Sequence, residues 1–279
     1  MDVEHRDEFW TPSGVRLRCR TRRTGDLNWL FLPGGPGIGS ESLTELVDTV
    51  RVPGTSWLVD LPGDGSNVDA PGAPTDPYEL WPGVLLEAAR AVPNPVFVGH
   101  STGGMYLLSV PELEQVVVGL ALVSTAPDAT WMPVFEAMTQ RHPLPGVEAA
   151  AAQLEARSDD ESLRAVAVAS APWNFTPAGV EAGARLLARM PYNLPAVEWS
   201  AENFDRTYVH SWWPHALPTL VVSGGEDRIV DQSLWDDTRY TGPHVLRRTI
   251  TGGAHFPWIE QPDQVRAAFV ALTDVLRLG

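Results

Sequence analysis

The sequence predicts an α/β fold in which a mainly parallel β-sheet is flanked by helices and carries an inserted helical cap. Short apolar runs alternate with segments of helical periodicity over the first 127 residues. This alternation stops between residues 128 and 217, where helical periodicity alone continues, and it returns from residue 218. Strands that alternate with helices pair in parallel and are covered on both faces. We therefore expect residues 1–127 and 218–279 to form the core and residues 128–217 to form the cap.

Each expected strand is a short apolar run bounded by Gly, Pro, Asn or Asp, the residues that end strands in turns. Residues 116–123 are apolar throughout, which is typical of a strand buried on both faces. The predicted strands are residues 15–19, 29–32, 56–60, 95–99, 116–123, 219–223 and 244–249.

Helices are expected between these strands. Residues 40–50 form one helix with Ser40 as its capping residue, and residues 77–91 form another, which Pro77 opens. Apolar residues recur at helical spacing in the second of these segments, and a closing helix is expected over residues 262–278.

The charge and the composition exclude several classes of function. Acidic residues number 35 and basic residues 20, so the net charge of -15 disfavours binding to nucleic acid and to anionic membrane surfaces. Every basic residue is Arg, and without Lys no Schiff base with a substrate or with pyridoxal phosphate can form. Cys19 is the single cysteine, which excludes an intrachain disulfide, and the histidines lack the spacing of metal ligands. The chain shows neither a signal peptide nor a long apolar run, so we expect a cytoplasmic protein. We also expect neither a metal nor a cofactor, and a small-molecule substrate as the partner.

The segment Gly99-His100-Ser101-Thr102-Gly103 matches the GxSxG nucleophile elbow. It lies between a predicted strand and a predicted helix, as that motif requires. The tight turn strains the backbone of the serine and leaves no room for larger side chains at the two glycine positions. Ser101 is therefore the candidate nucleophile, at the start of a helix whose free amides favour a developing negative charge.

An acid and a histidine follow the serine in the order that this motif requires. Asp227 lies just after the strand predicted at residues 219–223, where a carboxylate can orient a histidine ring. The neighbouring Glu226 is the rival acid, and we favour Asp227. His255 lies in a glycine-rich turn after the last predicted strand, and an imidazole can take the serine proton near neutral pH.

A glycine-rich loop at residues 32–37 follows the second predicted strand. Backbone amides in such loops can turn towards a negative charge, so we expect the amides of Gly35 and Thr102 to form an oxyanion hole. A phosphate-binding loop is the alternative, but the chain has neither GxxxxGK[ST] nor any lysine to complete one.

Together these motifs resemble the α/β-hydrolase superfamily and, within it, the proline iminopeptidase-like branch. The resemblance covers residues 10–127 and 218–278. Its four motifs are Gly34 to Gly37, residues 60–66, the elbow, and His255 with the trailing Glu260 and Pro262. It implies an eight-stranded sheet with a cap over the active site, and the same triad and oxyanion donors at the positions already named.

Three departures from the branch bear on the substrate. Pro33 replaces the family's histidine in HGGPG, and Thr102 replaces the tryptophan that follows the serine in iminopeptidases. In those enzymes a cap glutamate binds the free amine of the substrate, whereas the nearest match here, residues 173–177, contains no acid. Other cap acids either replace that glutamate or are solvated charges on helix faces: Glu198, Glu202 and Asp205.

The residues therefore predict a serine hydrolase that cleaves a carboxylic ester, thioester or lactone of a hydrophobic small molecule through an acyl-enzyme on Ser101. A proline iminopeptidase, which cleaves amides, is the alternative, and a hydrolase-fold receptor with vestigial turnover is the alternative of another class. The tryptophans of the cap either contact the substrate or pack within the cap. The residues expected to bind the substrate are Gly34, His100, Trp131, Trp173 and Phe256.

Overall fold

The computed structural model describes residues 6–278, which form a core around one eight-stranded sheet. The strands lie in the order β1-β2-β4-β3-β5-β6-β7-β8. The pairs β1/β2 and β2/β4 are antiparallel, and the other neighbouring pairs are parallel, which confirms the predicted mainly parallel sheet. The strands are β1 (Glu8–Trp10), β2 (Arg16–Arg22), β3 (Asn28–Leu32), β4 (Thr55–Asp60), β5 (Pro95–His100), β6 (Gly119–Val123), β7 (Thr219–Gly224) and β8 (Val245–Ile250).

The helices divide between this core and an insertion between β6 and β7. Those of the core are α1 (Thr44–Val50), α2 (Leu85–Arg90), α3 (Thr102–Leu107), α10 (Pro257–Glu260) and α11 (Pro262–Leu278). Those of the insertion are α4 (Trp131–Arg141), α5 (Pro145–Arg157), α6 (Asp160–Ala169), α7 (Ala171–Asn174), α8 (Val180–Ala188) and α9 (Leu194–Asn203). Five 3-10 helices complete the described chain: η1 (Ser40–Leu43), η2 (Tyr78–Leu80), η3 (Pro111–Gln115), η4 (Gln232–Asp236) and η5 (Thr238–Tyr240). The inserted helices are thus confirmed, and residues 128–217 stay the proposed limits of the cap.

None of the helices within residues 6–278 combines the length and the apolar character that a helix needs to cross a membrane.

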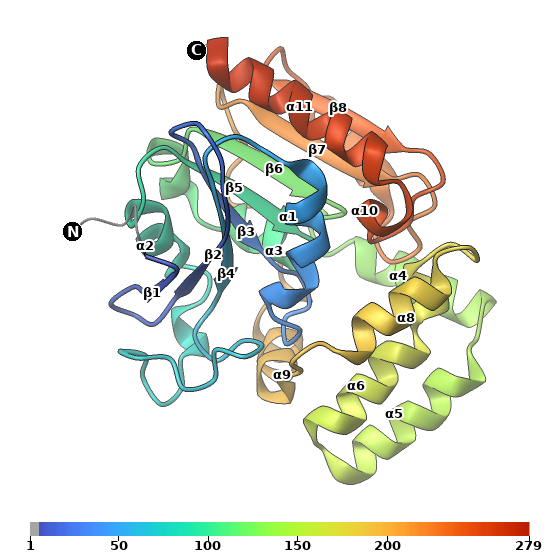
Figure 1. The fold of residues 1–279 in the computed structure, drawn as a ribbon. Coiled ribbons are helices and arrows are strands. Elements are labelled where there is room, and N and C mark those ends of the chain that lie inside the picture. Colours follow the sequence, from blue (N-terminus) through green and yellow to red (C-terminus); the bar gives the residue numbers. More distant parts are fainter. Residues whose placement is uncertain (1–5, 279) are drawn as a thin grey trace.

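The sheet separates the core into two apolar layers, because alternate side chains of a strand point to opposite faces. Leu30 and Leu32 of β3 pack in the layer of α2 and α3, whereas Trp29 and Phe31 pack in the layer of α1 and α11. Figure 1 shows α1 and α11 on the same side of the sheet, where they contact each other. Burial on both faces explains why the central strands are continuously apolar.

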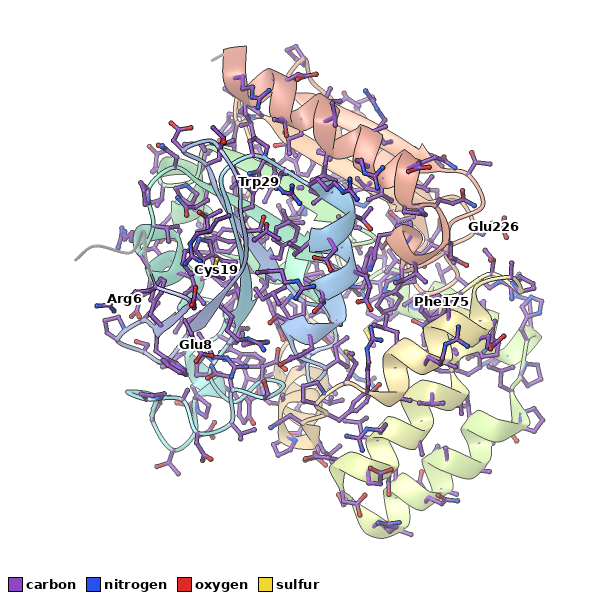
Figure 2. All side chains as sticks on the ribbon, viewed as in Figure 1. Arg6, Glu8, Cys19, Trp29, Phe175 and Glu226 are labelled. Atoms are coloured by element: carbon purple, nitrogen blue, oxygen red, sulfur yellow. The ribbon has the colours of Figure 1, made fainter. Side chains whose placement is uncertain are left out.

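The cap lies to one side of the core, with α5, α6 and α8 in a row (Figure 1). Phe175 and Leu186 of the cap join the apolar layer of α1 and α11. Figure 2 shows Phe175 where the cap meets the core. Its ring stacks on that of Phe256, with 5.1 Å between the centroids and 21° between the planes. The cap therefore shares one apolar layer with the loop that carries His255.

The single helix predicted over residues 77–91 is wrong. The structure has η2 and the short α2 in its place. Pro82 has no amide hydrogen to donate, and Trp81 before it is extended, with φ −76° and ψ 145°. A proline inside the helical pattern therefore divides this segment into two short elements.

Three other details of the elements differ from expectation. Ser40 does not cap α1, because residues 40–43 form η1 and the Ser40 hydroxyl accepts a hydrogen bond from Arg18 Nη2 at 2.9 Å. The strand predicted from residue 116 begins at Gly119, because the amide of Val116 still donates to the last turn of η3. The sequence did not predict β1, whose three residues are too few to show a periodic pattern.

Candidate active site

Ser101 lies in the turn between β5 and α3. Its backbone has φ 50° and ψ −126°, a combination that side chains other than glycine rarely adopt. The Ser101 amide donates to Val123 O at 2.9 Å, which ties the turn to the neighbouring strand β6. The turn therefore presents the serine at the carboxyl edge of the sheet.

Two glycines leave room for this turn and for the loop beside it. A Cβ atom at Gly103 would lie 2.3 Å from Pro33 O, and one at Gly34 would lie 2.6 Å from Ser101 Cβ. Both distances are shorter than non-bonded atoms tolerate, so only glycine fits at these positions. In the structure the glycine-rich loop follows β3 and extends over residues 33–40, and it lies directly against the candidate nucleophile.

The ring of His255 reaches both other members of the predicted triad. The Ser101 hydroxyl donates to His255 Nε2 at 3.1 Å, and His255 Nδ1 donates to Asp227 Oδ2 at 3.0 Å. His255 is 4 % exposed, so water is largely excluded from this chain of hydrogen bonds. Since a carboxylate accepts from Nδ1, the unprotonated Nε2 faces the serine and is ready to take its proton.

Asp227, and not its neighbour Glu226, supplies the carboxylate at His255. The side chain of Asp227 is 1 % exposed and also accepts from Ile229 N at 2.9 Å, Val230 N at 3.1 Å and Gln232 Nε2 at 3.1 Å. Glu226 is exposed, and Figure 2 shows it at the outer edge of the molecule. The two acids therefore point in different directions from one loop.

Two backbone amides beside the serine are free to bind an oxyanion. In the described part of the chain, neither the amide of Gly35 nor that of Thr102 donates to a protein acceptor. The Thr102 hydroxyl donates to Gly35 O at 3.0 Å and so joins the two segments. Two free amides on either side of a nucleophile are the arrangement that stabilises the negative charge of a tetrahedral intermediate.

His100 packs against His255, with 4.9 Å between the ring centroids, and is 1 % exposed. Its Nε2 donates to His255 O at 3.0 Å. Burial lowers the pKa of His100 well below its ordinary value, and the nearby His255 lowers it further. The ring is therefore neutral, and its hydrogen bond to His255 O holds the backbone of the loop that carries His255.

The remaining aromatic residues expected at the substrate lie at different depths. Phe256 is buried in the core layer of α1 and α11. Trp173 is half-buried in α7, and its indole nitrogen donates to His142 O at 2.9 Å. Trp131 is half-buried at the start of α4 and packs, with Phe135, in a row that reaches Trp173. The two tryptophans are thus partly accessible, whereas Phe256 is part of the core.

An apolar group that we call the junction cluster connects the nucleophile, the acid loop and the cap. Met105 follows Ser101 by one turn of helix, and Val230 follows Asp227 in its loop. The ring of Trp131 packs against the cluster. Its members are Met105, Ala126, Tyr208 and Val230. Met105 and Val230, which follow two members of the predicted triad in the chain, therefore pack in one cluster with residues of the cap.

Two acidic residues to which the sequence analysis gave no role lie against the loops of the site. Glu260 Oε2 accepts from Ala254 N at 2.7 Å, directly before His255. Asp64 Oδ1 accepts from Gly37 N at 2.7 Å, two residues after Gly35. Each belongs to a motif that carries the family resemblance. Membership of these motifs is the signal in the sequence that could have identified the two acids.

The rings of two other histidines lie within hydrogen-bonding distance of backbone carbonyl oxygens. His210 Nδ1 lies 3.0 Å from Pro127 O, and His244 Nε2 lies 2.9 Å from Pro214 O. Among residues 6–278, no group of three or more His, Cys, Asp or Glu side chains is arranged to hold a metal ion.

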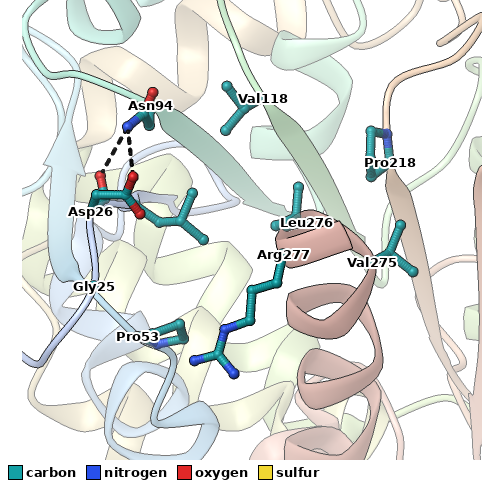
Figure 3. Close-up of a pocket in the computed structure, with 10 residues that line it drawn as sticks. Gly25, Asp26, Pro53, Asn94, Val118, Pro218, Val275, Leu276 and Arg277 are labelled. Carbon is teal, nitrogen blue, oxygen red and sulfur yellow. Dashed lines mark hydrogen bonds between the residues drawn. The ribbon is translucent and has the colours of Figure 1, made fainter. Parts of the chain in front are cut away.

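A hollow of about 530 Å³ lies on the opposite edge of the sheet (Figure 3). Asn94, Val118 and Pro218 line it, and these residues directly precede β5, β6 and β7. It therefore lies at the amino ends of the strands, whereas Ser101 and Asp227 follow the carboxyl ends. Parallel sheets bind their substrates at the carboxyl ends, so this hollow is separate from the candidate site.

Comparisons with known proteins extend over the core and the cap. A model of the alpha/beta hydrolase family matches residues 29–268. The chain is 28% identical over 229 residues to the pimeloyl-[acyl-carrier protein] methyl ester esterase of Xanthomonas axonopodis pv. citri, across 76% of this chain and 81% of that protein. The crystal structure of the Mycobacterium smegmatis proline iminopeptidase matches with a TM-score of 0.64 and 18% identity, over 97% of this chain and 99% of that one. The esterase RhEst1 from Rhodococcus sp. ECU1013 matches with a TM-score of 0.68 and 19% identity, over 96% and 98%.

Proposed function

Because the chain belongs to the alpha/beta hydrolase family, we propose that it is a serine hydrolase that cleaves carboxylic esters of hydrophobic small molecules. The expected resemblance to this superfamily is confirmed. The observation that carries the proposal is the chain of hydrogen bonds from Ser101 Oγ to His255 Nε2 and from His255 Nδ1 to Asp227. This is the geometry in which a histidine activates a serine as a nucleophile.

The reaction proceeds through an acyl-enzyme on Ser101. The serine oxygen attacks the ester carbonyl carbon while His255 Nε2 takes its proton, and the amides of Gly35 and Thr102 bind the oxyanion. The protonated ring then gives its proton to the departing alkoxide, which leaves as the alcohol. Water next attacks the acyl carbon with His255 again as base, and the protonated ring returns the proton to Ser101 Oγ as the bond to the acyl carbon breaks and the acid is released. Asp227 holds the ring in the required tautomer throughout.

The junction cluster supports a hydrophobic acyl or alcohol group in the substrate. Met105 and Val230 follow Ser101 and Asp227 closely in the chain but are buried, whereas Trp131, which packs against them, is half-buried and partly accessible. A partly accessible apolar side chain beside a catalytic group is typical of sites that bind hydrophobic ligands. Replacing Trp131 with Ala should therefore raise KM for long-chain esters more than for acetate esters.

The charge of the cap favours uncharged substrates over polyanionic ones. Residues 128–217 contain six arginines and eleven acidic residues. Four of these arginines form ion pairs: Arg157 with Asp159, Arg164 with Glu161, Arg185 with Glu181, and Arg189 with Glu45. Paired guanidinium groups attract an anion weakly. We expect simple esters, thioesters or lactones to be cleaved in preference to coenzyme A thioesters.

The iminopeptidase alternative requires an acid that binds the free amine of the substrate. Near His255 the cap presents Asn174, whose backbone oxygen accepts from His255 N at 3.1 Å and whose side chain donates to Ser170. Glu198 and Glu202 are exposed, and Asp205 accepts from Ser200 Oγ at 2.8 Å. An ester substrate needs no such acid, so the ester proposal ranks first.

Labelling with a fluorophosphonate tests the chemistry of Ser101. The native protein should be labelled at Ser101, and Ser101→Ala should not be labelled. Equal labelling of both proteins would overturn the proposal. The receptor alternative predicts instead no measurable turnover of esters, amides or lactones, with ligand binding that survives Ser101→Ala.

The substrate class is tested with p-nitrophenyl esters from acetate to decanoate, assayed beside proline p-nitroanilide. We expect kcat/KM to rise with chain length and the anilide to be cleaved poorly. Cleavage of the prolyl anilide alone would replace the ester proposal with the iminopeptidase alternative.

A further inference from the structure

Two carboxylates, one at the last residue of β4 and one in the turn that follows, accept hydrogen bonds from the backbone of the glycine-rich loop. Asp60 Oδ1 accepts from Ser40 N at 2.7 Å, and Asp64 Oδ1 accepts from Gly37 N at 2.7 Å. Gly37 follows the proposed oxyanion donor Gly35 by two residues. The position of that donor therefore depends on a loop that these two acids hold.

Asp60 is neutralised by neighbouring arginines. Its Oδ2 accepts from Arg16 Nη2 at 2.9 Å and from Arg18 Nη2 at 3.1 Å. Arg18 is shared with Glu41, at 2.7 Å. The carboxylate of Asp60 is fully buried, and these two guanidinium groups make its burial tolerable.

Asp64 has no such cation among the described residues. It is 2 % exposed, and the charged groups that act on it are Asp60 and Glu41, which are both negative. The hydroxyls of Tyr78 and Tyr106 complete the titratable groups around it. Burial, with the charge of Asp60 added, raises the pKa of Asp64 from 3.8 to about 7, although backbone amides that donate to it oppose the rise. A buried carboxyl without a cation destabilises a fold. This indicates that Asp64 contributes to the function of the site and not to the stability of the fold.

Gly37 is held from the cap as well as from the core. Its carbonyl oxygen accepts from Asn193 N at 2.9 Å. Asn193 precedes α9, and its side chain accepts from Ala196 N at 3.0 Å and from the Tyr78 hydroxyl at 3.2 Å. Gly37 is thus fixed between Asp64 on its amide and a cap residue on its carbonyl, and loss of either hydrogen bond frees one side of the loop.

We propose that Asp64 is a positioning residue, which holds Gly37 so that the amide of Gly35 faces the oxyanion formed at Ser101. This inference rests on the proposed function, since it names a further residue of the same site. A hydrogen bond to a carboxylate is shorter and stronger than one to a neutral carboxyl. The loop is therefore held most firmly when Asp64 is ionised. The hydrogen bond from Gly37 N to Asp64 weakens as the pH falls through 7 and the carboxylate is protonated.

The test compares Asp64→Asn with the native protein. Asparagine has the shape of aspartate and keeps an acceptor oxygen, but it cannot ionise. Asp69→Asn is the matched control, because Asp69 is an exposed acid a few residues further along the same loop. Three quantities are measured over a range of pH: kcat and KM for a p-nitrophenyl ester, the rate of fluorophosphonate labelling of Ser101, and hydrogen exchange of residues 33–40 corrected for intrinsic rates.

The positioning role predicts that Asp64→Asn lowers kcat roughly ten- to hundredfold above pH 7 with little change in KM, because a displaced donor affects the transition state most. The acid limb of the native kcat profile should be steeper than that of the variant, which has lost one ionisation. Exchange of residues 33–40 should be faster in Asp64→Asn and unchanged in Asp69→Asn.

The proposal is overturned if Asp64→Asn has the kcat, labelling rate and pH profile of the native protein, or if Asp69→Asn reproduces its effects. Failure of the proposed function has a different signature, namely that the native protein neither labels at Ser101 nor turns over any ester. Hydrogen exchange of residues 33–40 then still decides whether Asp64 holds the loop.

Discussion

Glu260 accepts two hydrogen bonds from Thr176, one from its amide at 2.7 Å and one from its hydroxyl at 2.6 Å. The other carboxylate oxygen accepts from Ala254 N, next to His255. One side chain thus connects the cap to the loop that carries His255. We therefore expect a change in the cap segment around Thr176 to alter the position of the proposed general base.

Glu260→Ala should lower both stability and activity. The substitution leaves the amides of Thr176 and Ala254 without their acceptor, at a cost of about 2–4 kcal/mol in the free energy of unfolding. Because the loop of His255 loses one anchor, kcat should fall while Ser101 remains chemically intact. Urea unfolding and ester hydrolysis measure the two effects. Glu181→Ala, at an exposed cap residue that forms an ion pair with Arg185, is the control and should change stability by less than about 1 kcal/mol. A stability loss no larger than that of the control would contradict the prediction.

Asp227→Asn and Glu226→Gln separate two adjacent acids. Asparagine at 227 cannot hold the required tautomer of His255, so kcat should fall about 10⁴-fold. Glu226 is exposed and is not bonded to His255, so Glu226→Gln should retain nearly native kcat. Steady-state kinetics on one ester measure kcat for both variants. A large loss of kcat in Glu226→Gln would show that Asp227 is not the acid of the site. Combining Asp227→Asn with His255→Ala should add little to the loss from His255→Ala alone.

Gly103→Ala should disturb the active site, whereas Gly146→Ala should not. The new Cβ at position 103 would meet Pro33 O at 2.3 Å and must displace the loop that carries Gly35. We expect a loss of about 1–3 kcal/mol in stability and a lower kcat. At position 146, in α5, the nearest atom is Ala169 Cβ at 3.8 Å, so alanine fits and should stabilise the helix by about 0.5–1 kcal/mol. Thermal unfolding compares the two variants, and equal Tm shifts would refute the steric argument.

Asp64→Asn should change how stability depends on pH. Because the folded state keeps the Asp64 proton up to a pKa of about 7, against 3.8 for an ordinary aspartate, folding loses stability as pH rises between these two values. Asparagine removes this loss. The free energy of unfolding of the variant, relative to the native protein, should therefore rise over this range by up to roughly 4 kcal/mol. Urea unfolding at stepwise pH tests this, and a difference that stays constant with pH would show that Asp64 ionises normally.

Local patterns in the sequence predicted the sheet and the turn at Ser101 well, because those features depend on nearby residues. The apolar runs of β3, β5, β6 and β7 lie close to where they were expected, since a strand buried on both faces has a composition of its own. The GxSxG spacing predicted a strained serine, because only glycines permit so tight a turn. The segment around Pro82 was predicted less well, because its apolar residues have helical spacing although Pro82 has no amide hydrogen to donate.

By itself, then, the sequence determined the succession of strands and helices along the chain, and it pointed to Ser101, His255 and one of two adjacent acids. Only the tertiary structure decided that Asp227 is the acid that contacts His255, that Asp64 is buried without a cation among the described residues, and that Glu260 binds the cap. These relationships join segments that lie far apart in the chain, and their directions depend on how the loops pack at one edge of the sheet. Periodicity and motif spacing report the local conformation of each segment, but the side-chain partners arise only when those segments are folded against one another.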